Sequence, residues 1–301
     1  MNAPFHQRVL PAAHDTPRAE PVGRDRRRSA LVMAVIIMGL GILLYPSTAD
    51  WFSRLTHNNE ISQYREATAG ITPTERSEAL RLADAYNSGM PQGPLRDPFA
   101  YESAGVDTDA GYAAYEQLLR VSDSGVISRI KFVDAGIDLP VHHGTDDEVI
   151  SKGAGHLYGS SLPVGGPSTH AVLTAHSGLP SASLFTPLHN VELGNEFWVE
   201  VLGERHWYRV ENIEIVEPND LRQMQIIEGR DFVTLFTCTP VGVNSHRLLV
   251  RGERIEAPPD SIGEMQSDVT AGFPWWAVVF IGGTTATWWL LFRKPRVANQ
   301  V

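Results

Sequence analysis

The chain has 301 residues, of which 43% are hydrophobic and 20% charged, the composition of a folded protein rather than a disordered or collagen-like one. Its 25 basic and 35 acidic residues give a formal net charge of −10, which argues against a nucleic-acid-binding protein. A single cysteine, Cys238, excludes an intramolecular disulfide and a cysteine-rich zinc or iron–sulfur site.

Basic residues gather at the two ends of the chain. Residues 1–30 contain six arginines and three acidic residues, and residues 293–301 contain three basic residues and no acid. The part between them has 16 basic and 32 acidic residues, so it is strongly acidic. We interpret residues 1–28 and 293–301 as two basic tails that flank an acidic domain.

An uncharged apolar run adjoins each basic tail. The runs are residues 29–49 and 273–292, and about 20 helical residues are enough to cross the ~30 Å hydrocarbon layer of a membrane. Tryptophans near both ends of the second run are typical of a membrane interface. Because Lys and Arg beside a span favour the cytoplasmic side, we expect both tails to be cytoplasmic and the domain between them extracellular, held on the cell membrane.

The first run has a second interpretation, as a signal peptide that is cleaved. Arg26, Arg27 and Arg28 would form its basic start, and Ser47 and Ala49 are small enough for the positions before a cleavage site. Both interpretations export the acidic domain, and the mass of the mature N-terminus distinguishes them.

Residues 50–124 are predicted to be mainly helical. Residues 50–67 show weakly amphipathic spacing. A second helix is predicted to begin after Thr72, with Pro73 at its first position and a capping box between Thr72 and Glu75.

Other segments around the domain are predicted to be short or irregular. Residues 90–105 include three prolines, which argues against regular structure, and a short helix is expected at 112–119. After the domain, residues 256–272 are predicted to be a linker to the second apolar run.

Residues 125–255 are predicted to form β-strands. The segments are short, rich in β-branched and aromatic residues and separated by turn residues. Many short strands with few long helices are typical of a closed β-barrel or a β-sandwich, so the fold class is mainly β. The predicted strands are 126–134, 137–143, 171–177, 196–202, 206–218, 232–238 and 246–255.

Cys238 ends an apolar strand. At such a position the strand fixes the backbone, while the side chain faces the rim of the predicted β-structure. An inert buried cysteine is the alternative, since free cysteines are often buried. Two observations favour a functional thiol: the neighbours Thr237 and Thr239 are not aliphatic, and an unpaired thiol in an exported domain is open to oxidation.

A nucleophilic thiol needs a base or a cation nearby, because the thiolate is the reactive form. His176 follows a predicted strand and precedes a Gly-containing loop, so its imidazole should also face a rim. The chain has no H-E-x-x-H or similar metal-binding spacing, so we expect no metal site. The histidines that compete with His176 are His142, His143, His156, His170, His189, His206 and His246.

Arg247 is the candidate for stabilising a developing oxyanion. A hairpin turn at 241–245 would return Arg247 beside Cys238, and a guanidinium offers five fixed donors and stays charged. Arg251 and Arg254 compete with it, but Arg251 should lie ~13 Å further along the same strand.

These residues resemble the signature of sortases. The segment TLFTCTPVGVNSHRLLVRGERI has the family's strand ending in Thr-Cys and its arginine on the following strand, in the form found in class C, the pilin-polymerising sortases of Gram-positive bacteria. The similarity covers about residues 45–255 and includes THAVLTAHSGLP around His176. Ser177 departs from the pattern, since many relatives carry a basic residue there. The resemblance implies an eight-stranded barrel preceded by helices and no cofactor.

The resemblance also implies a catalytic triad of His176, Cys238 and Arg247. Cys238 would attack the Thr–Gly bond of a Leu-Pro-X-Thr-Gly (LPXTG)-like sorting signal to form a thioacyl enzyme. His176 would act as general acid and then general base, and Arg247 would hold the substrate and the oxyanion. The partners implied are pilin subunits, one of which supplies a lysine as acceptor for an isopeptide bond.

Class C sortases also tend to carry a lid, which Asp97, Pro98 and Phe99 match within residues 90–105. We expect Asp97 to pair with Arg247 and the Phe99 ring to cover the Cys238 sulfur. An exposed ion pair of ~0–1 kcal/mol and a sulfur–aromatic contact of ~0.3–1.5 kcal/mol would let such a lid open readily. The alternative is that Asp97 and Pro98 merely form a turn.

Two other functions compete with a pilin-polymerising enzyme. A housekeeping sortase would attach surface proteins to the cell wall with the same triad, but such enzymes usually lack the lid and the C-terminal anchor. A membrane-held pilus scaffold without catalysis is the third hypothesis, and the intact Cys238, His176 and Arg247 argue against it.

Overall fold

The computed structural model describes residues 26–89, 95, 97–99, 110–218, 220–259 and 271–293. The predicted tails at 1–28 and 293–301 and the predicted linker at 256–272 therefore lie largely outside the described residues. The described chain separates into two compact units, one within residues 1–42 and 280–301 and the other within residues 43–279.

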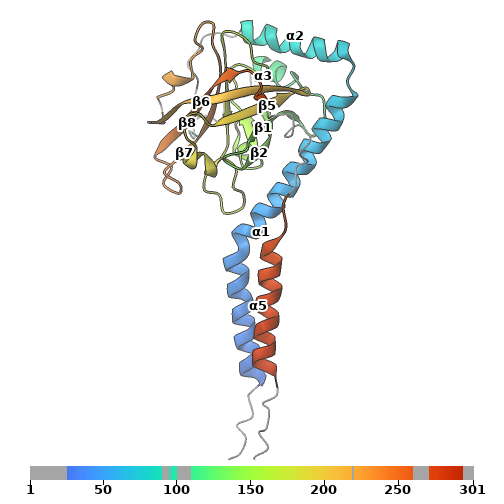
Figure 1. The fold of residues 1–301 in the computed structure, drawn as a ribbon, viewed down its shortest axis with the longest axis vertical. Helices are drawn as coiled ribbons and strands as arrows, with labels where there is room; N and C mark the ends of the chain where they lie inside the picture. Colours follow the sequence, from blue (N-terminus) through green and yellow to red (C-terminus); the bar gives the residue numbers. More distant parts are fainter. Residues whose placement is uncertain are drawn as a thin grey trace, which may run out of the picture. The chain divides into compact units, whose positions relative to one another are not determined.

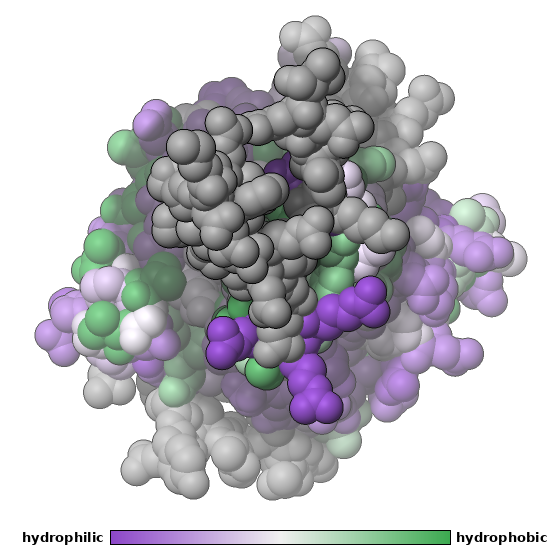
Figure 2. Space-filling view, turned by 90° about the horizontal axis from the view of Figure 1, so that it is seen from below, coloured by the Kyte–Doolittle hydropathy of each residue, from purple (hydrophilic) through white to green (hydrophobic). Residues whose placement is uncertain are grey.

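The smaller unit pairs the start of helix α1 (Arg26–Gly70) with most of helix α5 (Trp275–Phe292), side by side (Figure 1). Both helices are long and apolar enough to cross a membrane, and the apolar window of each is almost entirely unburied by the protein. Gly283 lets them approach, because a Cβ there would lie 3.2 Å from the Leu40 side chain. Figure 2, a view of the molecule from below, shows hydrophilic and hydrophobic side chains lying next to one another on the surface.

Helix α1 is continuous over 45 residues, where separate segments at 29–49 and 50–67 were predicted. Pro46 lies inside it without ending it. A proline removes one hydrogen bond and crowds only the preceding turn. Beyond Pro46, burial of Ile61 and Tyr64 stabilises the rest of the helix.

Helix α2 (Pro73–Gly89) begins as predicted. The Thr72 amide donates to the Glu75 carboxylate at 2.8 Å and the Glu75 amide donates to the Thr72 hydroxyl at 3.2 Å, which completes the capping box. The next helix, α3 (Ala110–Tyr115), is shorter than the predicted 112–119, because the chain turns and Leu119 adopts a left-handed conformation with φ of 58°.

Eight strands form a closed barrel in the order β1-β2-β3-β4-β7-β8-β6-β5, which confirms the mainly β, eight-stranded prediction. Strand β3 was not predicted, since three residues are too short to show an alternating pattern. A four-residue helix, α4 (Asp147–Ile150), precedes it. The strands are β1 (Val126–Phe132), β2 (Ile137–His143), β3 (Ala154–His156), β4 (Thr169–Thr174), β5 (Glu196–Val201), β6 (Glu204–Val216), β7 (Asp231–Thr239) and β8 (His246–Ile255).

Buried hydrogen bonds fix the second half of α1 to the barrel. The Tyr64 hydroxyl donates to the Ile127 carbonyl at 3.0 Å and accepts from the Leu202 amide at 2.8 Å. About two turns earlier, the His57 Nε2 lies 2.6 Å from the Lys152 carbonyl. These bonds reach both β1 and the β5–β6 turn, so α1 forms part of the domain's framework.

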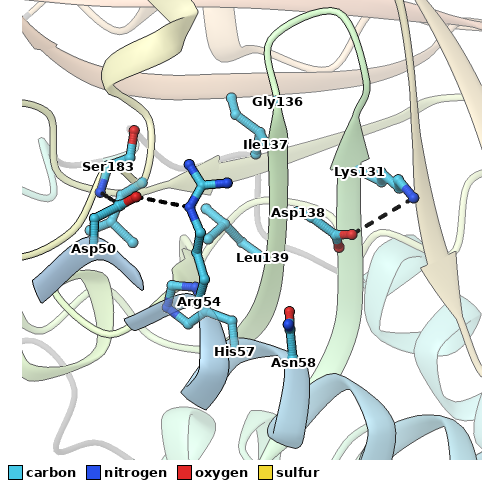
Figure 3. Close-up of a pocket in the computed structure, with 11 residues that line it drawn as sticks. Asp50, Arg54, His57, Asn58, Lys131, Gly136, Ile137, Asp138, Leu139 and Ser183 are labelled. Carbon is cyan, nitrogen blue, oxygen red and sulfur yellow. Dashed lines mark hydrogen bonds and ion pairs between the residues drawn. The ribbon is translucent and has the colours of Figure 1, made fainter. Parts of the chain in front are cut away.

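A polar pocket lies where α1 meets the β1–β2 hairpin (Figure 3). Its charges are paired inside the protein: Arg54 lies 2.8 Å from Asp50, and Lys131 lies 3.8 Å from Asp138. Asp50 also accepts the Ser183 amide at 2.7 Å. Asp138 is also held by the buried Arg129 at 2.6 Å, so each lining cation has a carboxylate partner and the pocket connects helix and barrel through ion pairs.

Candidate active site

Cys238 and Arg247 lie directly opposite each other on the antiparallel strands β7 and β8. Opposed residues on neighbouring antiparallel strands have Cα atoms about 4.5–5.5 Å apart and point to the same face of the sheet. The predicted hairpin at 241–245 is thereby confirmed as the turn that returns Arg247 to the cysteine. Both side chains are buried, with Cys238 5% and Arg247 6% exposed.

His176 reaches the same place from the other side of β7. Strands β4 and β7 are parallel and pair as far as Thr174 with Phe236; His176 lies two residues beyond the end of β4, and Cys238 lies two residues beyond Phe236 on β7. The Ser177 hydroxyl continues this alignment by donating to the Cys238 carbonyl at 2.7 Å. Three adjacent strand ends therefore present an imidazole, a thiol and a guanidinium in a row.

Asp147 contacts the His176 ring, which was not anticipated from the sequence. Its carboxylate lies 2.8 Å from His176 Nε2, and its own side chain is 91% exposed while that of His176 is 21% exposed. Asp147 is the first residue of α4, which lies between β2 and β3. The only sequence signal would have been the acidic run at 146–148, which resembles any solvated turn.

Five of the seven competing histidines are buried or half-buried in structural surroundings. Burial lowers the pKa of His143 to about 3 and those of His142, His156, His170 and His206 to about 4, so all five are neutral near pH 7. His156, for example, bonds the Tyr115 hydroxyl and the Ser161 carbonyl. Within the described part of the chain, no group of three or more His, Cys, Asp or Glu residues could hold a metal ion.

Asp97 makes a bidentate pair with Arg247. Arg247 Nη2 donates to Asp97 Oδ2 at 2.7 Å, and Arg247 Nε donates to Oδ1 at 3.1 Å. The side chains are 2% and 7% exposed, so the expectation of an exposed, weak pair is wrong. The loop folds over the guanidinium and removes both charges from water, which strengthens their attraction and also costs desolvation. Apart from Leu95 and 97–99, the predicted lid at 90–105 lies outside the described residues.

Phe99 follows Pro98 and packs its ring over the site. The ring stacks on Phe236 with centroids 5.7 Å apart, lies 5.5 Å from the His176 ring and holds the Arg247 guanidinium 5.3 Å from its centroid. The Phe99 amide donates to Asp97 Oδ1 at 3.1 Å, which shapes the turn. Phe99 therefore lies between two members of the expected triad.

The closed arrangement disfavours the thiolate. Burial raises the pKa of Cys238 to about 11, with Arg247 lowering it and Asp97 raising it. The Arg247 guanidinium donates hydrogen bonds to the Asp97 carboxylate and to the backbone carbonyls of Asn244 and His246. An imidazole, a thiol and a guanidinium are groups that can perform acyl transfer, and here Asp97 occupies donors of the guanidinium.

A family model described as "Sortase domain" matches residues 130–255. Among curated proteins, sortase A of Streptococcus agalactiae serotype III (strain NEM316) is 28% identical over 131 residues, covering 42% of this chain and 52% of the relative. Sortase A of Bacillus anthracis is 26% identical over 132 residues, covering 43% and 60%. The chain thus spans little more than half the length of these curated relatives.

Solved structures match over more of their length. Sortase C-1 from Actinomyces oris is 41% identical, with 60% of this chain and 99% of that one covered and a TM-score of 0.57. Sortase C1 of Streptococcus agalactiae is 40% identical, with 68% and 98% covered and a TM-score of 0.61. A pilus-related sortase C of Group B Streptococcus is 39% identical, with 66% and 98% covered and a TM-score of 0.59.

Proposed function

The chain belongs to the sortase family, and on that premise we propose that it is a class C cysteine transpeptidase that joins pilin subunits. The observation that carries the proposal is that Cys238 lies opposite Arg247 on β7 and β8, while Ser177, the neighbour of His176, donates to the Cys238 carbonyl at 2.7 Å. Relatives at about 40% identity, one of them described as pilus-related, support the choice of pilins.

In the first half of the proposed reaction, the Cys238 thiol transfers its proton to His176, and the thiolate sulfur attacks the Thr–Gly carbonyl of an LPXTG-like sorting signal. The C–S bond forms, and the carbonyl electrons move onto an oxyanion that Arg247 stabilises once Asp97 has left it. When the tetrahedral intermediate collapses, the C–N bond breaks and protonated His176 gives its proton to the leaving glycine amine. The product is a thioacyl enzyme.

In the second half, a pilin lysine amine attacks the thioacyl carbonyl. Neutral His176 takes a proton from that nitrogen, the C–S bond breaks, and the sulfur leaves as the thiolate beside Arg247. The new C–N bond is an isopeptide bond between two pilin subunits. The chemistry needs no cofactor.

The segment at 97–99 is proposed to be a lid that holds the resting enzyme inactive. Its carboxylate occupies the donors that would bind the oxyanion, and its aromatic ring packs on His176. Because Asp97 also raises the pKa of Cys238, lid opening should both free Arg247 and favour the thiolate.

The membrane arrangement follows from charge. We propose that residues 29–49 and 273–292 span the cell membrane, with the basic residues beside them in the cytoplasm and the barrel outside. If the first segment is cleaved as a signal peptide, the C-terminal span alone would anchor the enzyme.

The test is to produce the enzyme in cells that express a pilin, replace Cys238 with Ala, and compare pilin ladders on denaturing gels. The proposal predicts high-mass ladders with the wild type and none with Cys238→Ala. Ladders that persist in the variant would overturn it. Purified enzyme given a sorting peptide with either a pilin lysine or a cell-wall amine separates the pilin enzyme from a housekeeping sortase by the product formed.

A further inference from the structure

A second pocket, here called the arginine pocket, lies between the α1–α2 junction and the β5–β6 hairpin. Its volume is about 460 Å³, within the range of small-molecule sites. Trp207 in its wall pairs with Ile255 on β8, eight residues from Arg247, so the pocket lies roughly 26 Å along that strand from the thiol. The lining residues are Arg65, Thr68, Ala69, Arg76, Glu200, Gly203, Arg205, Trp207 and Ala257.

Three arginines face one carboxylate in this pocket. Glu200 is already engaged, with its carboxylate 2.9 Å from Arg205, and these side chains are 6% and 13% exposed. Arg76 donates to the Thr68 carbonyl at 3.3 Å. Within the described residues, neither Arg65 nor Arg76 lies within 4.0 Å of a carboxylate, so two positive charges remain uncompensated.

The backbone holds these cations in place. Leu202 and Gly203 have φ of 49° and 85°, the left-handed pair of a two-residue hairpin turn, and this turn lies against Arg76. Tyr64 bonds the Leu202 amide from α1, one residue before Arg65. Since helix and hairpin are tied at the pocket, the backbone positions from which Arg65 and Arg76 extend are set before a ligand binds, which lowers the entropic cost of binding.

Two uncompensated guanidinium groups in a chain of net charge −10 indicate a site for an anion. Guanidinium forks match phosphate oxygens with paired, charge-assisted hydrogen bonds, and two positive charges match a phosphate group better than a single carboxylate. In the polar pocket of Figure 3 both lining cations, Arg54 and Lys131, have a carboxylate partner, whereas Arg65 and Arg76 in this pocket have none among the described residues. We propose that the arginine pocket binds a phosphate-bearing ligand.

The test is titration of the full-length protein in neutral-lipid nanodiscs with inorganic phosphate, observed by calorimetry at constant ionic strength. The proposal predicts saturable binding that weakens by about tenfold or more in Arg65→Gln/Arg76→Gln. Arg81→Gln, on the same helix as Arg76 but paired with Glu78 on the surface, is the matched control and should bind as the wild type does. Circular dichroism verifies that each variant is folded.

Absence of saturable binding, equal binding by the double variant, or equally tight binding of acetate would each overturn the proposal. A second arm uses nanodiscs that contain phosphatidylglycerol. Weaker binding of inorganic phosphate to these nanodiscs would identify lipid headgroups as the source of the phosphate group. Unchanged binding would identify a soluble phosphate-bearing ligand. Because no residue of the triad lines this pocket, Cys238→Ala should bind phosphate normally, so failure here is distinct from failure of the proposed transpeptidase.

Discussion

Asp97 is the residue that sets the charge around Cys238 in the closed site. It holds the Arg247 guanidinium in a buried bidentate pair, and it adds to the burial that raises the pKa of the thiol to about 11. The cation that should favour the thiolate is therefore neutralised at rest. An enzyme built this way keeps its only cysteine protonated near pH 7.

Replacing Asp97 with Ala should expose the thiol and return Arg247 to it. Because each unit of lowered pKa raises the thiolate fraction tenfold well below the pKa, we expect alkylation of Cys238 by iodoacetamide at pH 7 to speed up by about tenfold or more. The pH at which the alkylation rate reaches half its maximum should also fall. A rate and profile equal to those of the wild type would show that Asp97 does not guard the thiol.

Asp147 is predicted to position the His176 ring without taking part in proton transfer. Asp147→Asn should lower kcat by at most about fivefold and leave KM unchanged, since an exposed pair contributes only ~0–1 kcal/mol. Single-turnover acylation with a sorting peptide separates the effect on kcat from the effect on KM. A loss of several hundredfold would instead assign Asp147 a direct part in the chemistry.

At the scale of elements, helix α1 acts as a brace: its Tyr64 is hydrogen-bonded to two separate parts of the barrel, strand β1 and the β5–β6 turn. Tyr64→Phe would leave the Ile127 carbonyl and the Leu202 amide without their shared partner. Such loss of a buried bond should lower the free energy of unfolding by about 1–3 kcal/mol, seen as a lower Tm. Tyr45→Phe removes an exposed hydroxyl from the same helix and should leave the Tm unchanged; an equal Tm for both variants would contradict the brace.

The sequence alone predicts some of the elements and contacts around the site but not others. The strands around Cys238 and the hairpin to Arg247 are predictable, because β-rich runs and a short turn fix their register locally. The contact of Asp147 with His176 is not, since it depends on where a four-residue helix sits. The burial of Asp97 is not predictable either, because it depends on a contact with Arg247, 150 residues further along the chain.

For the whole molecule, the buried histidines make stability depend on pH. Their pKa values are lowered in the folded state, to about 4 for His156, whereas an unfolded histidine titrates near 6.5. The unfolded state therefore binds more protons below pH 6.5, and stability falls as the pH drops from about 6.5 towards 4. Burial raises the pKa of Glu60 and Asp231, which act in the opposite sense but are fewer.

We expect the Tm of the full-length protein in detergent to be lower at pH 5 than at pH 7.5. His156→Gln offers a control, because a side chain that cannot titrate should reduce the difference between the two Tm values. A Tm that is equal at both pH values, or higher at pH 5, would contradict the assignment of neutral, buried imidazoles.

The transpeptidase account depends most directly on a covalent bond between Cys238 and a sorting signal. Full-length protein carrying Asp97→Ala should be incubated with an LPXTG-containing peptide and examined by mass spectrometry after proteolysis. The account predicts a hydroxylamine-sensitive acyl adduct on Cys238 that ends at the threonine of the peptide and is lost when Cys238→Ala is added. A wild-type and an opened enzyme that both lack the adduct, or that carry it on another residue, would contradict the account.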